Sequence, residues 1–271
     1  MLRKYNKIKK AFKDEIKQTH GRVSVTVYLT LRLLVIICMI LEFLRGDLNN
    51  AFLCLLSLIL FLMPFFIEKK FKIDLPDTLE IIIFLFIFSA EILGEINNFY
   101  GNIPHWDTIL HTINGFLCAS VGFSLVYLLN KKNNYIILSP IFVTLVSFCF
   151  SMTIGIVWEF FEYGADTLFD IDMQKDRYIE NINSVITDKT NSNKVVKYKN
   201  IEYTILYDKE GNEIVKLNNY LDIGLHDTMK DLLVNFIGAV IFSFFGYLYI
   251  LNHEKYHFID NFLLKRQINT E

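Results

Sequence analysis

The sequence predicts an all-α fold, a polytopic bundle of about six transmembrane helices with a small extracytoplasmic β-hairpin insertion. The chain is 53% hydrophobic and only 21% charged, which is too apolar for an ordinary soluble domain. Its apolar residues gather in long runs, and Lys and Arg gather in alternate connections between them. Runs such as residues 81–86 do not alternate between apolar and polar side chains, so spanning helices are predicted rather than a β-barrel.

The first element is a basic leader, residues 1–22, whose apolar residues recur at helical spacing opposite lysines. This pattern predicts an amphipathic helix on the inner leaflet, and a disordered basic tail is the alternative. The run that follows the leader lacks a small-residue cleavage site, so we expect the first span to remain as a membrane anchor.

Six apolar runs approach the roughly 20 residues that a helix needs to cross about 30 Å of hydrocarbon. They are Tyr28–Leu44, Ala51–Ile67, Thr78–Ile96, Thr108–Leu129, Tyr135–Trp158 and Leu232–Leu251. We therefore assign residues 23–166 to helices one to five and residues 227–251 to helix six. The cysteines all fall inside these runs, without a CxxC pair, and are typical of small buried apolar residues.

The positive charges predict the orientation. Lys and Arg concentrate in the leader, in the second and fourth connections and in the tail, residues 252–271. Because cytoplasmic loops carry such an excess, both termini are expected in the cytoplasm, which an even number of spans requires. No nucleic-acid partner is expected, and the lipids of the membrane are the first partners.

A polar insertion, residues 167–226, separates the last two spans and is predicted to form an extracytoplasmic cap. Within it, residues 195–207 alternate and are rich in β-prone side chains, residues 208–212 contain a glycine, and residues 214–217 are again apolar in part. This pattern predicts a β-hairpin over residues 195–217.

Acidic and histidine residues recur at helical spacing at four helix ends, and the predicted topology places all four at the outer boundary of the membrane. The stripes are Glu91 and Glu95; Asp107, His111 and Asn114; Glu159, Glu162 and Asp166; and Asp227, Asp231 and Asn235. Residues three or four apart share one helix face. The sequence therefore predicts one outward-facing polar cavity, and the alternative is that each residue marks only the water interface.

Carboxylates near hydrocarbon cost several kcal/mol unless they are hydrated, paired, protonated or bound to metal. Few cations accompany these stripes, so a divalent cation is expected as cofactor. The candidate ligands are Glu91, Glu95, Asp107, His111, Glu159, Asp227 and Asp231. Oxygen ligands with a single His favour Mg²⁺, Mn²⁺ or Ca²⁺, and Zn²⁺ fits less well because no thiolate is available.

The chain resembles a known family in four motifs, which are Glu91-x3-Glu95, Gly101-Asn-Ile-Pro-His-Trp-Asp-Thr-Ile-Leu-His111, Trp158-Glu-Phe-Phe-Glu162 and Asp227-Thr-Met-Lys-Asp231 with Asn235 and Gly238. These motifs resemble the YjdF-like family of bacterial integral membrane proteins over roughly residues 25–250, with a longer insertion here. The resemblance implies a multi-pass protein of the bacterial inner membrane with a shared polar site. A fainter similarity to VanZ-like proteins suggests an envelope-related role.

Three function classes stay open. In an accessory or sensing role, the cap engages an envelope protein or lipid-linked partner and the polar cluster supports it. In a metal-assisted hydrolase or transferase acting on a lipid-linked substrate, Glu159 or Glu162 would be the base and His111 a proton shuttle or ligand. In a cation- or proton-coupled transporter the same acids would form a relay, although transporter sites usually lie near the midplane between repeats.

Overall fold

The computed structural model describes residues 22–132, 138–169 and 172–266. Apart from Arg22, the expected amphipathic leader lies outside the described residues. Backbone contacts divide the chain into a helical unit, residues 1–155 and 233–271, and a cap unit, residues 156–232. The two boundaries fall inside the continuous helices α8 and α9.

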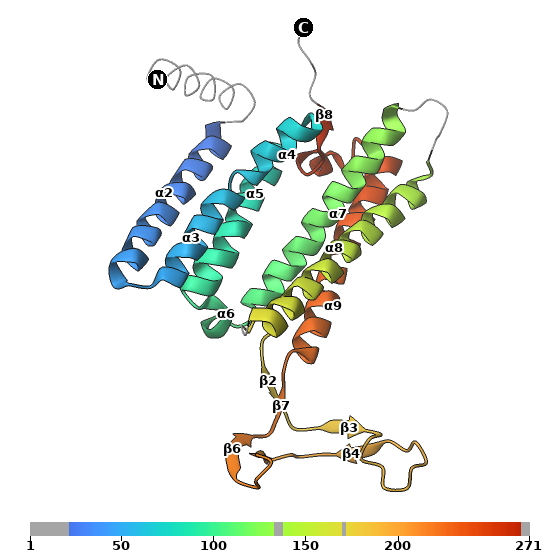
Figure 1. Ribbon diagram of the computed structural model, residues 1–271. Coiled ribbons are helices and arrows are strands. Elements are labelled where there is room, and N and C mark those ends of the chain that lie inside the picture. The colour runs from blue at the N-terminus through green and yellow to red at the C-terminus, as the bar shows by residue number, and fades with distance from the viewer. Residues whose placement is uncertain (1–21, 133–137, 170–171, 267–271) are drawn as a thin grey trace. The chain divides into compact units, whose positions relative to one another are not determined.

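The first half of the helical unit is a set of neighbouring helices (Figure 1). It comprises α2 (Arg22–Arg45), α3 (Leu48–Leu60), α4 (Met63–Phe71), α5 (Asp77–Ile87) and the π-helix η1 (Phe88–Ile96). The Asp47 side chain caps α3 by accepting a hydrogen bond of 3.0 Å from the backbone N–H of Asn50. One apolar core joins α2, α3, α5 and η1, and its buried members include Val35, Cys54, Phe84 and Ile92.

The second half comprises α6 (Phe99–Asn102), α7 (Trp106–Lys132), α8 (Pro140–Phe169) and α9 (Leu225–Leu251). Within the helical unit, buried serines join α7 to α8. The Ser147 hydroxyl donates to the Ala119 carbonyl at 2.6 Å, and the Ser151 hydroxyl donates to the Gly115 carbonyl at 2.7 Å. Such small residues let helix backbones approach closely in a membrane, where the hydrophobic effect does not hold helices together.

Five helices among the described residues are long and apolar enough to cross a membrane. They are Val23–Arg45, Leu48–Phe71, Trp106–Asn130, Pro140–Leu168 and Leu225–Leu251. The expected third span is helical as well, but it changes from α to π geometry at Phe88, so neither part reaches the length of a span on its own. The predicted class, a helical membrane bundle with a small sheet insertion, is confirmed.

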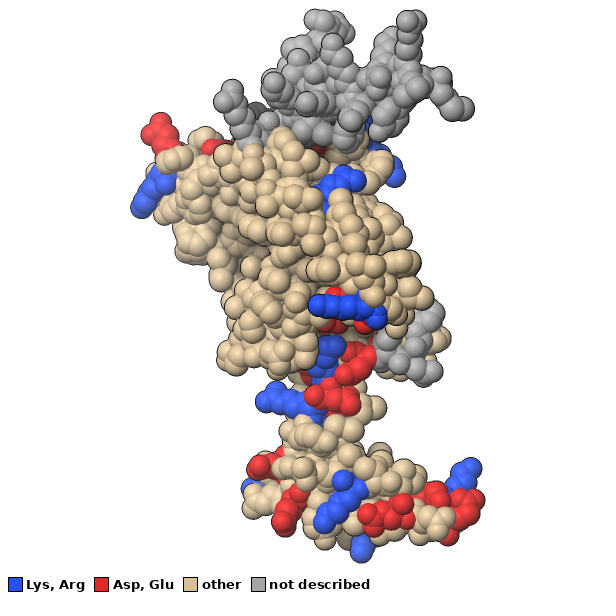
Figure 2. All heavy atoms as spheres, turned by 90° about the vertical axis from the view of Figure 1, so that its left-hand side faces the viewer, with Lys and Arg blue, Asp and Glu red and all other residues tan. Residues whose placement is uncertain are grey.

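The surface of the helical unit has the character of a lipid-facing surface. Figure 2 shows one of its faces almost free of charged side chains over most of the helices. Large apolar side chains stand out from it, such as Phe43 at 64% and Leu44 at 75% exposure on α2. An apolar surface of this extent is costly in water and favourable in hydrocarbon.

The segment after α9 is part of the core of the helical unit. It forms the 3₁₀-helix η2 (His257–Asn261) and strand β8 (Lys265–Arg266), which pairs with β1 (Ile73–Asp74). Ile259 is fully buried, and the Leu264 N–H donates to the Ser124 hydroxyl at 3.0 Å. From the sequence this segment was expected only as a tail, because its three buried apolar residues, Ile259, Leu263 and Leu264, are too few to resemble a span.

Among its described residues, the cap unit contains three antiparallel strand pairs. They are β2 (Arg177–Ile179) with β7 (Tyr220–Asp222), β3 (Ile182–Ser184) with β4 (Val196–Tyr198), and β5 (Tyr203–Tyr207) with β6 (Glu213–Asn218). The β5–β6 pair is the predicted hairpin. The expected first strand, residues 195–207, is however divided, because Asn200 adopts a left-handed φ of 54° and turns the chain between β4 and β5.

Candidate functional site

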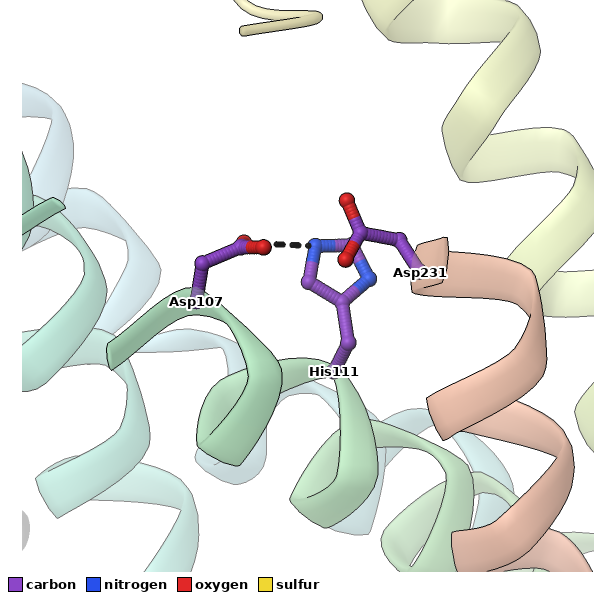
Figure 3. Close-up of side chains that lie close together, drawn as sticks. All are labelled: Asp107, His111 and Asp231. Atoms are coloured by element: carbon purple, nitrogen blue, oxygen red, sulfur yellow. Dashed lines mark ion pairs between the residues drawn. The ribbon is translucent and has the colours of Figure 1, made fainter. Parts of the chain in front are cut away.

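The polar site begins in the first two turns of α7, where Asp107 and His111 lie four residues apart. His111 Nε2 lies 3.2 Å from Asp107 Oδ1 (Figure 3), and the two side chains are 13% and 22% exposed. An acidic residue in the first turn also interacts favourably with the positive end of the helix dipole. The sequence prediction that these two residues share a face is confirmed.

Helices α7 and α9 approach closely one turn deeper in the helical unit. A side chain on Gly115 would overlap the carbonyl of Asn235, and one on Gly238 would overlap the carbonyl of Thr112. The Asn114 side-chain amide also donates to Asn235 Oδ1 at 3.3 Å. These contacts fix the position of α9 along α7 at Asn235, which is only 1% exposed.

Asp231 lies one turn before Asn235 on the same face of α9, as His111 lies one turn before Gly115 on α7. Asp107, His111 and Asp231 each offer one ligand atom, and these three atoms lie within 4.8 Å of one another (Figure 3). The Asp231 side chain is almost fully buried, and Lys230 Nζ lies 3.6 Å from its Oδ1. Two carboxylates and one imidazole are a donor set that can hold a divalent cation.

The other predicted ligands lie outside this group. On η1, Glu91 is half-buried whereas Glu95 is exposed, because the π-helix replaces the α-helical spacing on which their shared face was predicted. The start of η1 is held by Trp106, whose indole N–H donates to the Ser89 carbonyl at 3.2 Å. The spacing of acidic and histidine residues gave no signal for this contact.

In the cap unit, Glu159 and Glu162 of α8 are buried, at 5% and 7% exposure. Glu162 accepts a hydrogen bond of 2.7 Å from the indole N–H of Trp158 one turn before it. A buried carboxylate must be compensated, and this bond compensates part of the cost for Glu162. The proposed catalytic roles of both residues stay predictions.

Two acids of the predicted stripes anchor the base of the cap. Asp166 at the end of α8 accepts backbone hydrogen bonds from Met173 at 2.6 Å and Gln174 at 2.8 Å. Asp227 in the first turn of α9 accepts one from Lys175 at 2.9 Å. The chain from residue 173 to 175 is thus tied to both helices, which gives Asp166 and Asp227 a structural role that spacing alone did not reveal.

Two further buried acids, Glu68 and Glu80, lie near the end of the bundle that the charges predict to be cytoplasmic, and no sequence pattern indicates their burial. Glu68 is 3% exposed and accepts a hydrogen bond of 2.8 Å from the backbone N–H of Leu75. Glu80 is 6% exposed and accepts a hydrogen bond from the Ser24 hydroxyl. Both acids lie at the ends of apolar runs, where the sequence does not distinguish a buried carboxylate from an exposed one. Only the three-dimensional contacts show that they are buried.

Comparison with known proteins gives two matches. The family model described as "Predicted membrane protein (DUF2238)" matches residues 26–252. A Thermotoga maritima protein described as "Uncharacterized protein" is 27% identical over 113 residues, which are 41% of this chain and 57% of that protein, so the match covers less than two thirds of the relative. No solved structure matches. The matched range contains every candidate site residue and is consistent with the resemblance to YjdF-like proteins.

Proposed function

The chain belongs to the DUF2238 family of predicted membrane proteins, and we propose that it binds a divalent cation through Asp107, His111 and Asp231. The observation that supports the proposal most directly is the convergence of two carboxylates and an imidazole from α7 and α9. Three protein ligands leave further coordination positions open to water or to an anionic group of a second molecule.

Mn²⁺ is the cation that this donor set suits best, because Mn²⁺ accepts both carboxylate oxygen and imidazole nitrogen, whereas Mg²⁺ and Ca²⁺ prefer oxygen alone. Lys230 competes with the cation for Asp231, and His111 must be neutral to donate its lone pair. Metal affinity should therefore fall as the pH is lowered and His111 becomes protonated.

The proposed role is that of an envelope accessory or sensing protein in the bacterial inner membrane. Both termini are cytoplasmic, and the cap and the metal site face the outside. The open coordination positions would bind an anionic group of an envelope component, and the cap would engage the same partner. This orientation is supported by the excess of Lys and Arg in the leader and in alternate connections.

Thermal unfolding of the detergent-purified protein tests the metal site. Mn²⁺ at about a hundredfold excess over its dissociation constant should stabilise the folded state by about 2.7 kcal/mol, because it binds only that state. Asp107→Asn and His111→Ala should each remove most of the rise in melting temperature.

His226→Ala is the matched control, because His226 Nδ1 forms the same i, i+4 pair with Asp222 at 3.1 Å but is about half exposed. Its metal-induced shift should equal that of the wild type. A wild-type melting temperature that no divalent cation and no chelator changes would refute the proposal.

A further inference from the structure

A groove of about 370 Å³ opens on the side of the helical unit, between α5–η1 and α7. Ile82, Leu85 and Ser89 line one wall, and Trp106, Ile109 and Ile113 line the other. Leu85 is 45% exposed and Ile109 is 50% exposed, so the groove is open along its length rather than closed like an internal cavity.

The chemistry of the lining selects the kind of ligand. Apart from Ser89 and Trp106, all residues that line the groove are Leu, Ile and Phe. The Trp106 indole N–H already donates a hydrogen bond to the backbone carbonyl of Ser89. A sugar, a peptide or a free ion would lose its hydration here without gaining hydrogen bonds. A hydrocarbon chain would lose nothing.

The surroundings supply such a chain. The α7 wall of the groove belongs to the candidate membrane span Trp106–Asn130, so its open side meets the hydrocarbon of the bilayer rather than water. The groove begins at Trp106, a residue type that prefers the headgroup level. A chain that enters it therefore belongs to a molecule whose head group lies near the start of α7.

The first two turns of α7 also carry the Asp107–His111 pair, on the other side of the helix. Trp106, Ile109 and Ile113 share one helix face, and at about 100° per residue Asp107 and His111 lie about 140° around α7 from that face. A head group at the end of the groove near Trp106 is thus about one helix width from the polar pair.

From this arrangement we infer that the groove binds an acyl chain of an anionic membrane lipid, whose head group lies at the start of α7, about one helix width from Asp107 and His111. The head-group part rests on the proposed cation, since two carboxylates alone would repel an anion. The chain-binding part rests only on the groove.

Trp106 offers a direct reporter, because Trp106 and Trp158 are the two tryptophans of the chain. The Trp158→Phe protein is reconstituted in vesicles of a zwitterionic phospholipid. Mg²⁺ is supplied in place of Mn²⁺, because Mg²⁺ does not quench tryptophan fluorescence. An anionic phospholipid with brominated chains, which quench tryptophan, then replaces the host lipid stepwise. A binding site should give half-maximal quenching at a mole fraction about fivefold below that of random mixing.

Variants that fill the groove should remove this preference. Leu85→Phe and Ile109→Phe add volume inside the groove, and Leu145→Phe and Ile141→Phe make the same changes at exposed positions of α8 outside it. In the two groove-filling variants, quenching of Trp106 should rise in proportion to the mole fraction of brominated lipid. The two α8 variants should show the same preference as the Trp158→Phe parent. Two filled variants keep the test decisive if one of them fails to fold.

Chelation separates the two claims. If the preference for the brominated lipid persists in chelator and in Asp107→Asn, the groove binds the acyl chain and the proposed cation plays no part in lipid binding. Proportional quenching in a parent protein that a divalent cation still stabilises would overturn the groove site, and so would equal preference in the filled and the α8 variants.

Discussion

At the scale of single residues, two His–Asp pairs show how the surroundings decide the chemistry. Asp107–His111 and Asp222–His226 have the same spacing and nearly equal separations, 3.2 and 3.1 Å. His226 is about half exposed, and such a surface pair contributes about 0–1 kcal/mol. His111 is 13% exposed and lies beside the buried Asp231, which turns a helix-surface pair into a candidate ligand group.

The turn of the β5–β6 hairpin gives a residue-scale prediction with a defined pH dependence. Hydrogen bonds from the side chain and backbone of Asn212 hold the pKa of Asp208 below its usual range. The folded pKa lies below the unfolded value of about 3.9, so the carboxylate stabilises the hairpin above that value and loses this effect as the pH falls through the folded pKa.

Asp208→Ala should therefore lower hydrogen-exchange protection of the β5 and β6 amides at neutral pH, and the difference from the wild type should shrink in acid. Glu210→Ala, at an exposed position of the same turn, is the control. A loss of protection in Asp208→Ala that is unchanged in acid would show that the charge of Asp208 is irrelevant.

At the scale of elements, the packing of α7 on α9 positions the candidate ligands and depends on glycine. Gly115→Ala should destabilise the protein by about 1–3 kcal/mol, because the new Cβ must displace the backbone of Asn235 rather than a flexible side chain. Gly164→Ala on α8 is the matched control, since a Cβ there meets no atom within 4 Å. Thermal unfolding checks both, and equal melting temperatures would contradict the close packing.

The segment after α9 is a second element whose role is testable. Ile259→Ala removes a fully buried side chain and should cost about 2–5 kcal/mol. Phe258→Ala, at a neighbouring residue that is 40% exposed, should cost much less. If the two variants unfold at the same temperature, the segment does not pack into the helical unit as described.

The elements that the sequence predicts are those with a local signal. Long apolar runs predicted the spans, and alternation around Gly211 predicted the β5–β6 hairpin. The pairing of β2 with β7 depends on contacts between distant residues, and neither apolar runs nor alternation indicate the π geometry of η1 or the left-handed turn at Asn200. For the same reason spacing grouped Asp227 with Asp231, although Asp227 holds the backbone of Lys175.

At the scale of the whole molecule, the charge distribution predicts that the cap and the segment after α9 lie on opposite sides of the membrane. In a variant with all four cysteines replaced, Asn193→Cys in the cap should react with a membrane-impermeant thiol reagent on cells with a permeable outer envelope. Lys255→Cys should react only after the inner membrane is disrupted. The reverse pattern would invert the proposed orientation.

Whether α7 and α9 together bind a divalent cation can be read from the coordination of bound Mn²⁺. Pulsed electron paramagnetic resonance of the Mn²⁺-loaded protein detects nitrogen nuclei bound to the metal. We expect modulation from one imidazole nitrogen that disappears in His111→Ala and persists in His226→Ala, together with weaker Mn²⁺ binding in Asp231→Asn. Mn²⁺ that binds without a nitrogen signal, or with one that survives in His111→Ala, would contradict this expectation.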